Sequence, residues 1–208
     1  MLRIILILIL TLAIASCNGS VAPERKPGSQ PSSSPLASVD YNWKSGLFPF
    51  IHERMKIAGL KDLEASRLPP QDLEVRIWHG FGLIIPGGLV LKRSGGNWTA
   101  IHLASVSKKR HQRDSERILK EPKSGWQSCW SQLTNAGLLT LPDATQLGKE
   151  PVDPDVLSYV VELYIGGEYR TYHYTYPEAN EHREAKQMIK IGDIIAEEFG
   201  MPQFRTQR

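Results

Sequence analysis

Two runs of residues around Gly166-Gly167 restrict the fold of this 208-residue chain more than any other feature. Residues 156–165 and 168–176 alternate in the manner of β-strands, and the glycine pair tolerates the positive φ angles that a two-residue turn requires. Because such a turn fixes the strand register, Leu163 is expected opposite Arg170. The opposite face of this hairpin is more polar and is expected to face solvent. The predicted core face consists of Tyr159, Val161, Leu163, Ile165, Tyr172 and Tyr174.

The spacing of apolar residues predicts further strands and helices. Strands are expected at residues 72–79, 89–93 and 98–103, and the last two flank a turn that contains Gly95-Gly96. Helices are expected at residues 47–58, 126–136 and 185–199. We therefore predict an α+β fold for a single domain over residues 41–208. It would contain an antiparallel sheet of about five strands (two hairpins), helices packed on one face and a long C-terminal helix.

The N-terminal segment differs in character from this domain. Arg3 precedes an almost uninterrupted apolar run over residues 4–13, which matches the charged and hydrophobic regions of a secretory signal peptide. The run is too short to span a bilayer, which needs about 20 apolar residues. Residues 18–40 are rich in serine and proline, with prolines at every fourth position from Pro23 to Pro35, and they predict a disordered linker.

The apolar run ends in Ile14-Ala15-Ser16-Cys17, which resembles the lipobox of bacterial lipoproteins. The resemblance covers residues 1–17. It implies that residues 1–16 are a cleaved signal peptide and that the Cys17 thiol carries a diacylglyceryl group. Residues 17–40 would then be a lipidated linker that anchors the domain to the membrane on the exported side of the cell envelope. Asn18 replaces the aspartate that marks inner-membrane retention, which favours the outer membrane in a diderm cell. The resemblance implies no activity.

Composition excludes several classes of protein. The chain has only two cysteines, so no internal disulfide can form once Cys17 is acylated. Cys129 falls on the apolar side of a predicted helix, which favours a buried thiol over a reactive one. A formal net charge of +3 does not mark a nucleic-acid-binding protein, and nucleic acid is not an expected partner on the exported side of a membrane.

No metal and no cofactor is expected from the motifs present. His52 and Glu53 begin a pattern like that of the zinc proteases, but Lys56 stands where the second histidine is required. The glycine-rich residues 80–88 depart from a dinucleotide-binding fingerprint, because Ile85 occupies the place of its third glycine. Turns and close backbone packing explain these glycines better.

The strongest charge asymmetry lies in residues 108–123, which hold seven basic and three acidic residues and therefore carry a net charge of +4. The mature chain as a whole would carry +2, because Arg3 leaves with the signal peptide. Such a segment can contact anionic lipid headgroups, an acidic envelope polymer or a protein partner. The alternative is a solvated loop of mixed charges.

Two hypotheses for the function follow. The first is a noncatalytic, lipid-anchored module that binds an anionic envelope component or a protein partner. Its candidate contact residues are Trp78, Tyr164, Tyr169, Lys108, Lys109, Arg110, Arg113 and Arg117. The second is an envelope hydrolase in which an acid–base pair does the chemistry. Its candidate residues are His79, Glu162 and His173, and convergence of these three in one concave pocket would favour it.

Overall fold

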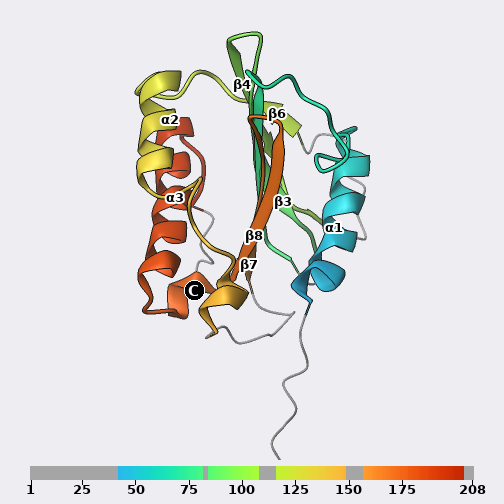
Figure 1. Cartoon of the computed structure of the whole chain (residues 1–208), viewed down its shortest axis with the longest axis vertical. Coiled ribbons are helices and arrows are strands. Elements are labelled where there is room, and N and C mark those ends of the chain that lie inside the picture. The colour runs from blue at the N-terminus through green and yellow to red at the C-terminus, as the bar shows by residue number, and fades with distance from the viewer. Residues whose placement is uncertain (1–41, 82–83, 108–115, 149–156, 204–208) are drawn as a thin grey trace, which may run out of the picture. The chain divides into compact units, whose positions relative to one another are not determined.

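Six antiparallel strands form the central sheet in the computed structural model of the chain, which describes residues 42–81, 84–107, 116–148 and 157–203 (Figure 1). Their order across the sheet is β6-β4-β3-β1-β7-β8. The strands are β1 (Leu73–His79), β3 (Gly87–Ser94), β4 (Asn97–Leu103), β6 (Glu116–Ile118), β7 (Ser158–Ile165) and β8 (Glu168–Thr175). Two short strands, β2 (Ile84–Ile85) and β5 (Val106–Ser107), pair separately. All described elements belong to one compact unit, Val39–Arg208.

Helices cover both faces of this sheet (Figure 1). Helices α2 (Trp126–Asn135) and α3 (Arg183–Phe199) pack on one face, and α1 (Trp43–Ile57) packs on the other. Two short 3-10 helices, η1 (Ala144–Leu147) and η2 (Pro177–Ala179), lie close to the β8 and α3 region. The predicted α+β fold with an antiparallel sheet and a long C-terminal helix is confirmed. The expectation that helices pack on one face holds for α2 and α3, whereas α1 covers the opposite face.

The hairpin formed by β7 and β8 has the predicted register. Leu163 lies opposite Arg170 and Glu162 lies opposite Thr171. Gly166 and Gly167 adopt φ angles of 63° and 90°, which a residue with a side chain rarely adopts. The sheet gains its sixth strand from β6, which lies within the basic segment and pairs with β4.

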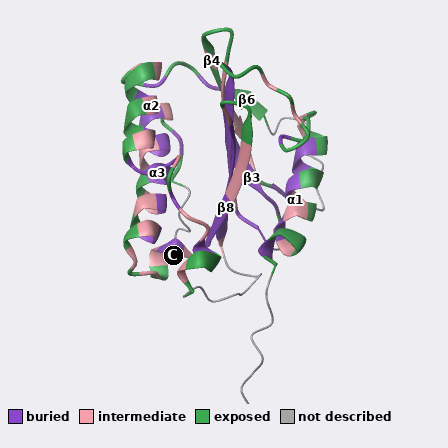
Figure 2. Cartoon of the chain, in the orientation of Figure 1, coloured by how far each residue is buried: buried purple, intermediate pink, exposed green. Residues whose placement is uncertain are grey.

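The central strands β1, β3 and β7 are buried on both sides, whereas the edge strand β6 is exposed (Figure 2). The predicted core face of the hairpin joins Val75, Ile77 and the apolar sides of α2 and α3 in one cluster. A second cluster lies under α1, where Trp43, Leu47 and Ile51 pack on the opposite face of the sheet. The prediction that this opposite face meets solvent is therefore wrong, because α1 has an apolar side of its own that must be covered.

Close approach of the backbones of β1 and β3 explains one glycine of the glycine-rich segment. A Cβ atom on Gly88 would lie 2.4 Å from the carbonyl oxygen of Ile77, closer than any packing arrangement tolerates. Gly88 stands opposite Trp78, whose large ring is fully buried beneath α1. The glycine thus leaves room for the tryptophan, as the close-packing interpretation of this segment predicts.

None of the helices in the described ranges combines the length and the apolar character needed to cross a membrane.

Candidate functional site beneath helix α1

The face of the sheet under α1 carries charged side chains that are almost completely buried. On β1, the Arg76 guanidinium binds the Glu74 carboxylate, with Nη2 at 2.6 Å and Nε at 2.8 Å from Oε1. Arg76 Nη1 also lies 2.9 Å from the sulfur of Met55 on α1. Only 2% of the Arg76 side chain and 8% of the Glu74 side chain are exposed. Such a pair is stable in the interior because each charge has a well-placed partner.

Glu162 on β7 is the second buried carboxylate of this face. Its Oε2 accepts a hydrogen bond of 2.6 Å from the Trp78 indole, and its Oε1 accepts one of 3.1 Å from the Tyr169 hydroxyl. Burial raises the pKa of Glu162, although the Trp78 hydrogen bond and the nearby Arg76 charge act in the opposite direction. Burial and the Glu162 carboxylate also raise the pKa of Tyr169. Both oxygens are thus satisfied by donors from neighbouring strands.

His173 on β8 forms a separate polar cluster near the start of α1. Asp143 Oδ2 accepts a hydrogen bond of 3.2 Å from the His173 backbone N–H and lies 3.4 Å from its ring Nδ1. The Trp43 ring stacks on the imidazole at a centroid distance of 4.4 Å. Burial alone would raise the pKa of Asp143, but hydrogen bonds from His173 and Thr145 and the charge of His173 lower it to about 2. These contacts join the start of α1 and the residue before η1 to β8, which is an edge strand of the sheet.

The three residues proposed for acid–base chemistry do not meet in one pocket. Glu162 and His173 share the face under α1, where their exposed fractions are 1% and 3%. His79 lies opposite Tyr159, a residue of the cluster under α2 and α3, so it belongs to the other face. Burial lowers the pKa of His79 to about 4, and the charge of His102 adds to this effect. The arrangement provides buried hydrogen-bond networks rather than a common catalytic cleft.

The aromatic contact residues expected from the sequence are mostly inside the protein. Trp78 is fully buried, Tyr164 is 4% exposed, and Tyr169 is half-buried with its hydroxyl on Glu162. The expectation that Trp78 and Tyr164 form a contact surface is corrected, because α1 covers the strand face that the alternation assigned to solvent. Arg117 is exposed on β6. The remaining candidates lie outside the described residues: Lys108, Lys109, Arg110 and Arg113.

Cys129 on α2 is buried and carries a free thiol, as predicted. Burial, with the neighbouring Glu198 charge, raises the pKa of this thiol to about 12. A thiol with so high a pKa is not a nucleophile at neutral pH.

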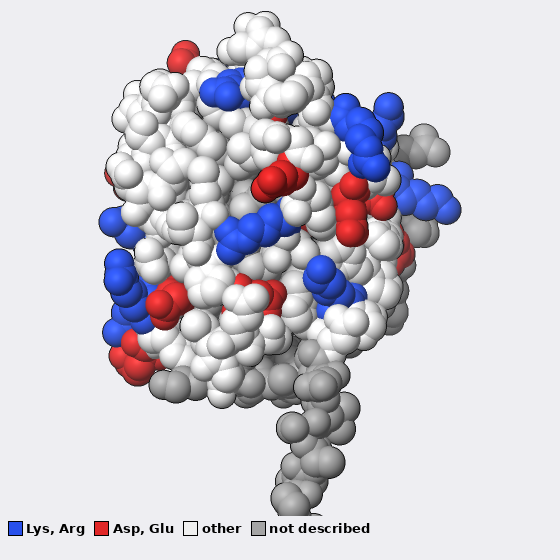
Figure 3. All heavy atoms as spheres, in the orientation of Figure 1, with Lys and Arg blue, Asp and Glu red and all other residues white. Residues whose placement is uncertain are grey.

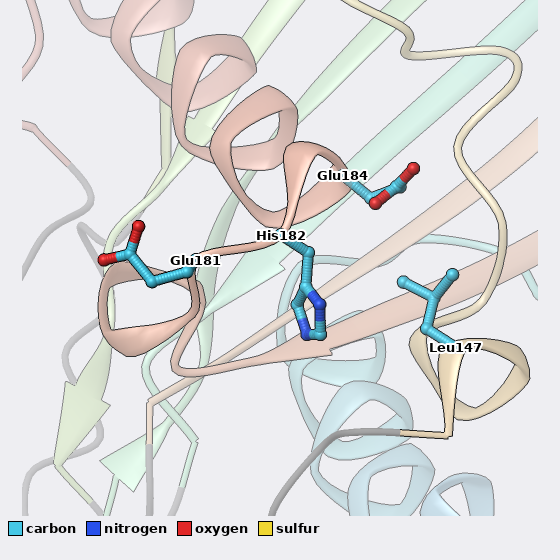
Figure 4. A pocket seen from close by; sticks show the side chains of 4 residues that line it. All are labelled: Leu147, Glu181, His182 and Glu184. Atoms are coloured by element: carbon cyan, nitrogen blue, oxygen red, sulfur yellow. The ribbon is translucent and has the colours of Figure 1, made fainter. Parts of the chain in front are cut away.

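A pocket of about 400 Å³ opens between η1 and the beginning of α3 (Figure 4). It is lined by Leu147, Glu181, His182 and Glu184. No sequence pattern predicts this pocket, since Glu181, His182 and Glu184 also suit an ordinary helix start. Within the ranges that the structure describes, no three His, Cys, Asp or Glu side chains are placed to share a metal ion.

The chain has no match among protein-family models, curated proteins or solved structures.

Replacing Glu162 tests whether the buried carboxylate supports the fold through its accepting oxygens. Glu162→Gln keeps a carbonyl oxygen for Trp78 and an amide that can donate to Tyr169, so we expect a change in unfolding free energy below about 1 kcal/mol. Glu162→Leu leaves the Trp78 N–H and the Tyr169 hydroxyl without this partner, and we expect a loss of about 2–4 kcal/mol. Urea denaturation at pH 7 measures both. Equal stability of the two variants would contradict the assigned role.

The low pKa of His79 predicts a loss of stability in mild acid. The folded-state pKa of about 4 lies below the ordinary value of 6.5, so the unfolded chain takes up the proton first as the pH falls. Between pH 7 and pH 5 we expect His79 to contribute a loss of about 2 kcal/mol, which His79→Gln removes. Urea denaturation across this pH range gives the comparison. His52→Gln is the matched control, because it makes the same replacement at a histidine that is exposed on α1. Equal changes in the two variants would contradict the role of burial at His79.

Proposed function

We propose that this chain is a lipoprotein of the bacterial cell envelope whose domain acts as a noncatalytic binding or interaction module. The observation that carries the proposal is Ile14-Ala15-Ser16-Cys17 at the end of a short apolar run that follows Arg3. Acylation at Cys17 would anchor the chain to the membrane on the exported side. Asn18 favours the outer membrane in a diderm cell. The linker that follows, with its regular prolines, suits a tether between the membrane and the domain.

The placement of the candidate catalytic residues supports a binding module over a hydrolase. A general acid or base must come within hydrogen-bond reach of its substrate. Glu162 instead accepts hydrogen bonds from Trp78 and Tyr169, and His173 lies between Trp43 and Asp143. The hydrolase alternative would require these buried networks to open before each reaction.

The anchor is tested by replacing the cysteine that would carry it. Wild-type protein extracted from the membrane fraction should show a diacylglyceryl-modified N-terminal Cys17 by mass spectrometry. Cys17→Ser should block both signal cleavage and acylation, because serine offers no thiol to the lipid transfer. Cys129→Ala is the matched control: it removes the other thiol of the chain, which is buried in α2, and processing should be unchanged.

A mature form that begins elsewhere than Cys17, or an acylated product in the Cys17→Ser variant, would contradict the anchor. Fractionation of the wild-type protein between inner and outer membranes tests the sorting inferred from Asn18.

The basic segment, residues 108–123, is the second part of the proposal. We propose that it contacts an anionic envelope component. The described part of this segment supports such contact, because Arg117, Lys120 and Lys123 are all exposed. Each basic residue near an anionic surface contributes about 1 kcal/mol of binding free energy.

A chain that begins at Asn18 lacks both signal and lipid, so its binding to vesicles measures the segment alone. We expect co-sedimentation with vesicles that contain phosphatidylglycerol and much less with pure phosphatidylcholine. Replacing Arg117, Lys120 and Lys123 together by glutamine should weaken this binding at least about tenfold.

A control variant removes the same number of basic residues from the outer side of α3. It carries Arg183→Gln, Lys186→Gln and Lys190→Gln, which are also exposed. If this variant loses as much binding as the first, the effect is one of total charge and the role of the basic segment is refuted.

A further inference from the structure

Helix α2 differs from its neighbour α3 in the chemistry of its outer side. Residues 124–142, which include all of α2, contain no Lys, Arg, Asp or Glu. The outer side of α3 carries the usual charged residues of a solvent-facing helix, among them Lys186, Lys190 and Glu197. In Figure 3 the surface over α2 is accordingly almost all white. An exposed helix normally has charged residues on its polar side, so their absence along all of α2 requires an explanation.

Three of the five tryptophans of the chain gather between α2 and the end of the β3–β4 hairpin. The rings of Trp98 and Trp126 are nearly parallel, with an interplanar angle of 4° and centroids 6.1 Å apart. The ring centroid of Trp130 lies 5.4 Å from that of Trp98, and the ring centroid of Phe199 on α3 lies 6.1 Å from that of Trp126. All four rings are half-buried, so each packs on the core while keeping part of its surface in contact with solvent.

The helical repeat places polar groups next to these rings. Trp126 and Trp130 are four residues apart and therefore lie on the same side of α2. Gln127 and Ser131 each follow one tryptophan and occupy the adjoining strip, where both are exposed. The guanidinium of Arg93 lies over Trp98, 5.4 Å from the ring centroid, so this ring already has a cation as a partner. Trp126 and Trp130 are half-buried and keep part of their surface in contact with solvent. We use the name tryptophan face for four residues of α2: Trp126, Gln127, Trp130 and Ser131.

We propose that the tryptophan face binds an uncharged carbohydrate, an inference that rests on the proposed role of the chain as an envelope binding module and names its ligand class. A pyranose ring presents C–H bonds on one side and hydroxyl groups around its rim. An indole ring offers a large rigid apolar surface for the C–H side. The amide of Gln127 and the hydroxyl of Ser131 both donate and accept hydrogen bonds, which matches the rim.

The absence of charge selects this ligand class over the alternatives. A surface for an anionic lipid or an acidic polymer needs basic residues, and the tryptophan face has none. Rigid aromatic rings also occur beside small hydrogen-bonding groups in known binding surfaces, where the rings supply contact area and the small groups supply adaptable hydrogen bonds. The tryptophan face is therefore a different surface from the basic segment and serves a different ligand.

The test uses the protein as purified from the membrane fraction in detergent micelles, and four uncharged probes: chitotetraose, cellotetraose, maltotetraose and mannotetraose. We expect a saturable change in tryptophan fluorescence with at least one probe at a Kd below about 10 mM. Trp126→Leu should weaken this binding at least about tenfold, because it removes one of the two stacking rings.

Gln127→Arg should weaken binding to a similar extent. Because Gln127 is exposed, this variant should keep the fold, and the test then stands even if the Trp126→Leu variant misfolds. Ser128→Arg is its matched control: it adds the same side chain at the next exposed position, about 100° away around the helix, and should bind as the wild type does. No saturable change with any probe, or equal losses in the two arginine variants, would overturn the inference.

Self-association would also overturn it. If sedimentation shows a dimer that Gln127→Arg dissociates, the tryptophan face binds a second copy of the chain instead of a sugar. The mass of the N-terminal peptide, measured on the same preparation, separates this test from that of the anchor. Acylated Cys17 without sugar binding refutes only the carbohydrate inference, and sugar binding by a chain without acylation refutes only the anchor.

Discussion

The hydrogen bonds to Glu162 are the interaction on which the arrangement under α1 depends. A carboxylate at 1% exposure is tolerated only when both oxygens have partners, and these come from Trp78 on β1 and Tyr169 on β8. The three residues thereby join β1, β7 and β8 side by side on the face that α1 covers. Any shift of one strand by a single residue would remove a donor and leave the carboxylate buried without it.

Helix α1 is positioned by polar contacts as well as by its apolar side. Its first residue, Trp43, stacks on His173, and Met55 near its end meets the Arg76 guanidinium. Arg54 adds an ion pair of 3.8 Å to Glu116 on β6. These contacts lie on three different strands spread across the sheet, from β8 at one edge to β6 at the other. Polar contacts fix the position of a helix more narrowly than apolar packing alone, because each one requires a specific distance and direction.

Local patterns sufficed to predict five of the six strands of the central sheet, the hairpin register and the α+β class. The register around Gly166-Gly167 was predictable because the turn and its two strands are adjacent in the sequence. The burial of the opposite face was not predictable, because a polar residue such as Glu162 produces the same sequence pattern on a solvent-exposed face as on a buried polar face. Only the position of α1, more than a hundred residues earlier, decides between them. The same long-range packing turned Trp78 and Tyr164 from expected contact residues into core residues.

Coverage of both faces of the sheet determines where this domain can meet other molecules. The side chains with the richest chemistry, Glu162, Arg76 and His173, hold the interior together and are withdrawn from solvent. Contact with a ligand therefore depends on the outer sides of the helices, the two edge strands and the loops. Among these, α3 has the charged outer side of an ordinary surface helix, whereas α2 combines half-buried tryptophans with a strip of neutral polar groups. An exposed helix side without charged residues lowers the solubility of a protein. Recognition of an uncharged ligand offers a physical reason why α2 carries no charge.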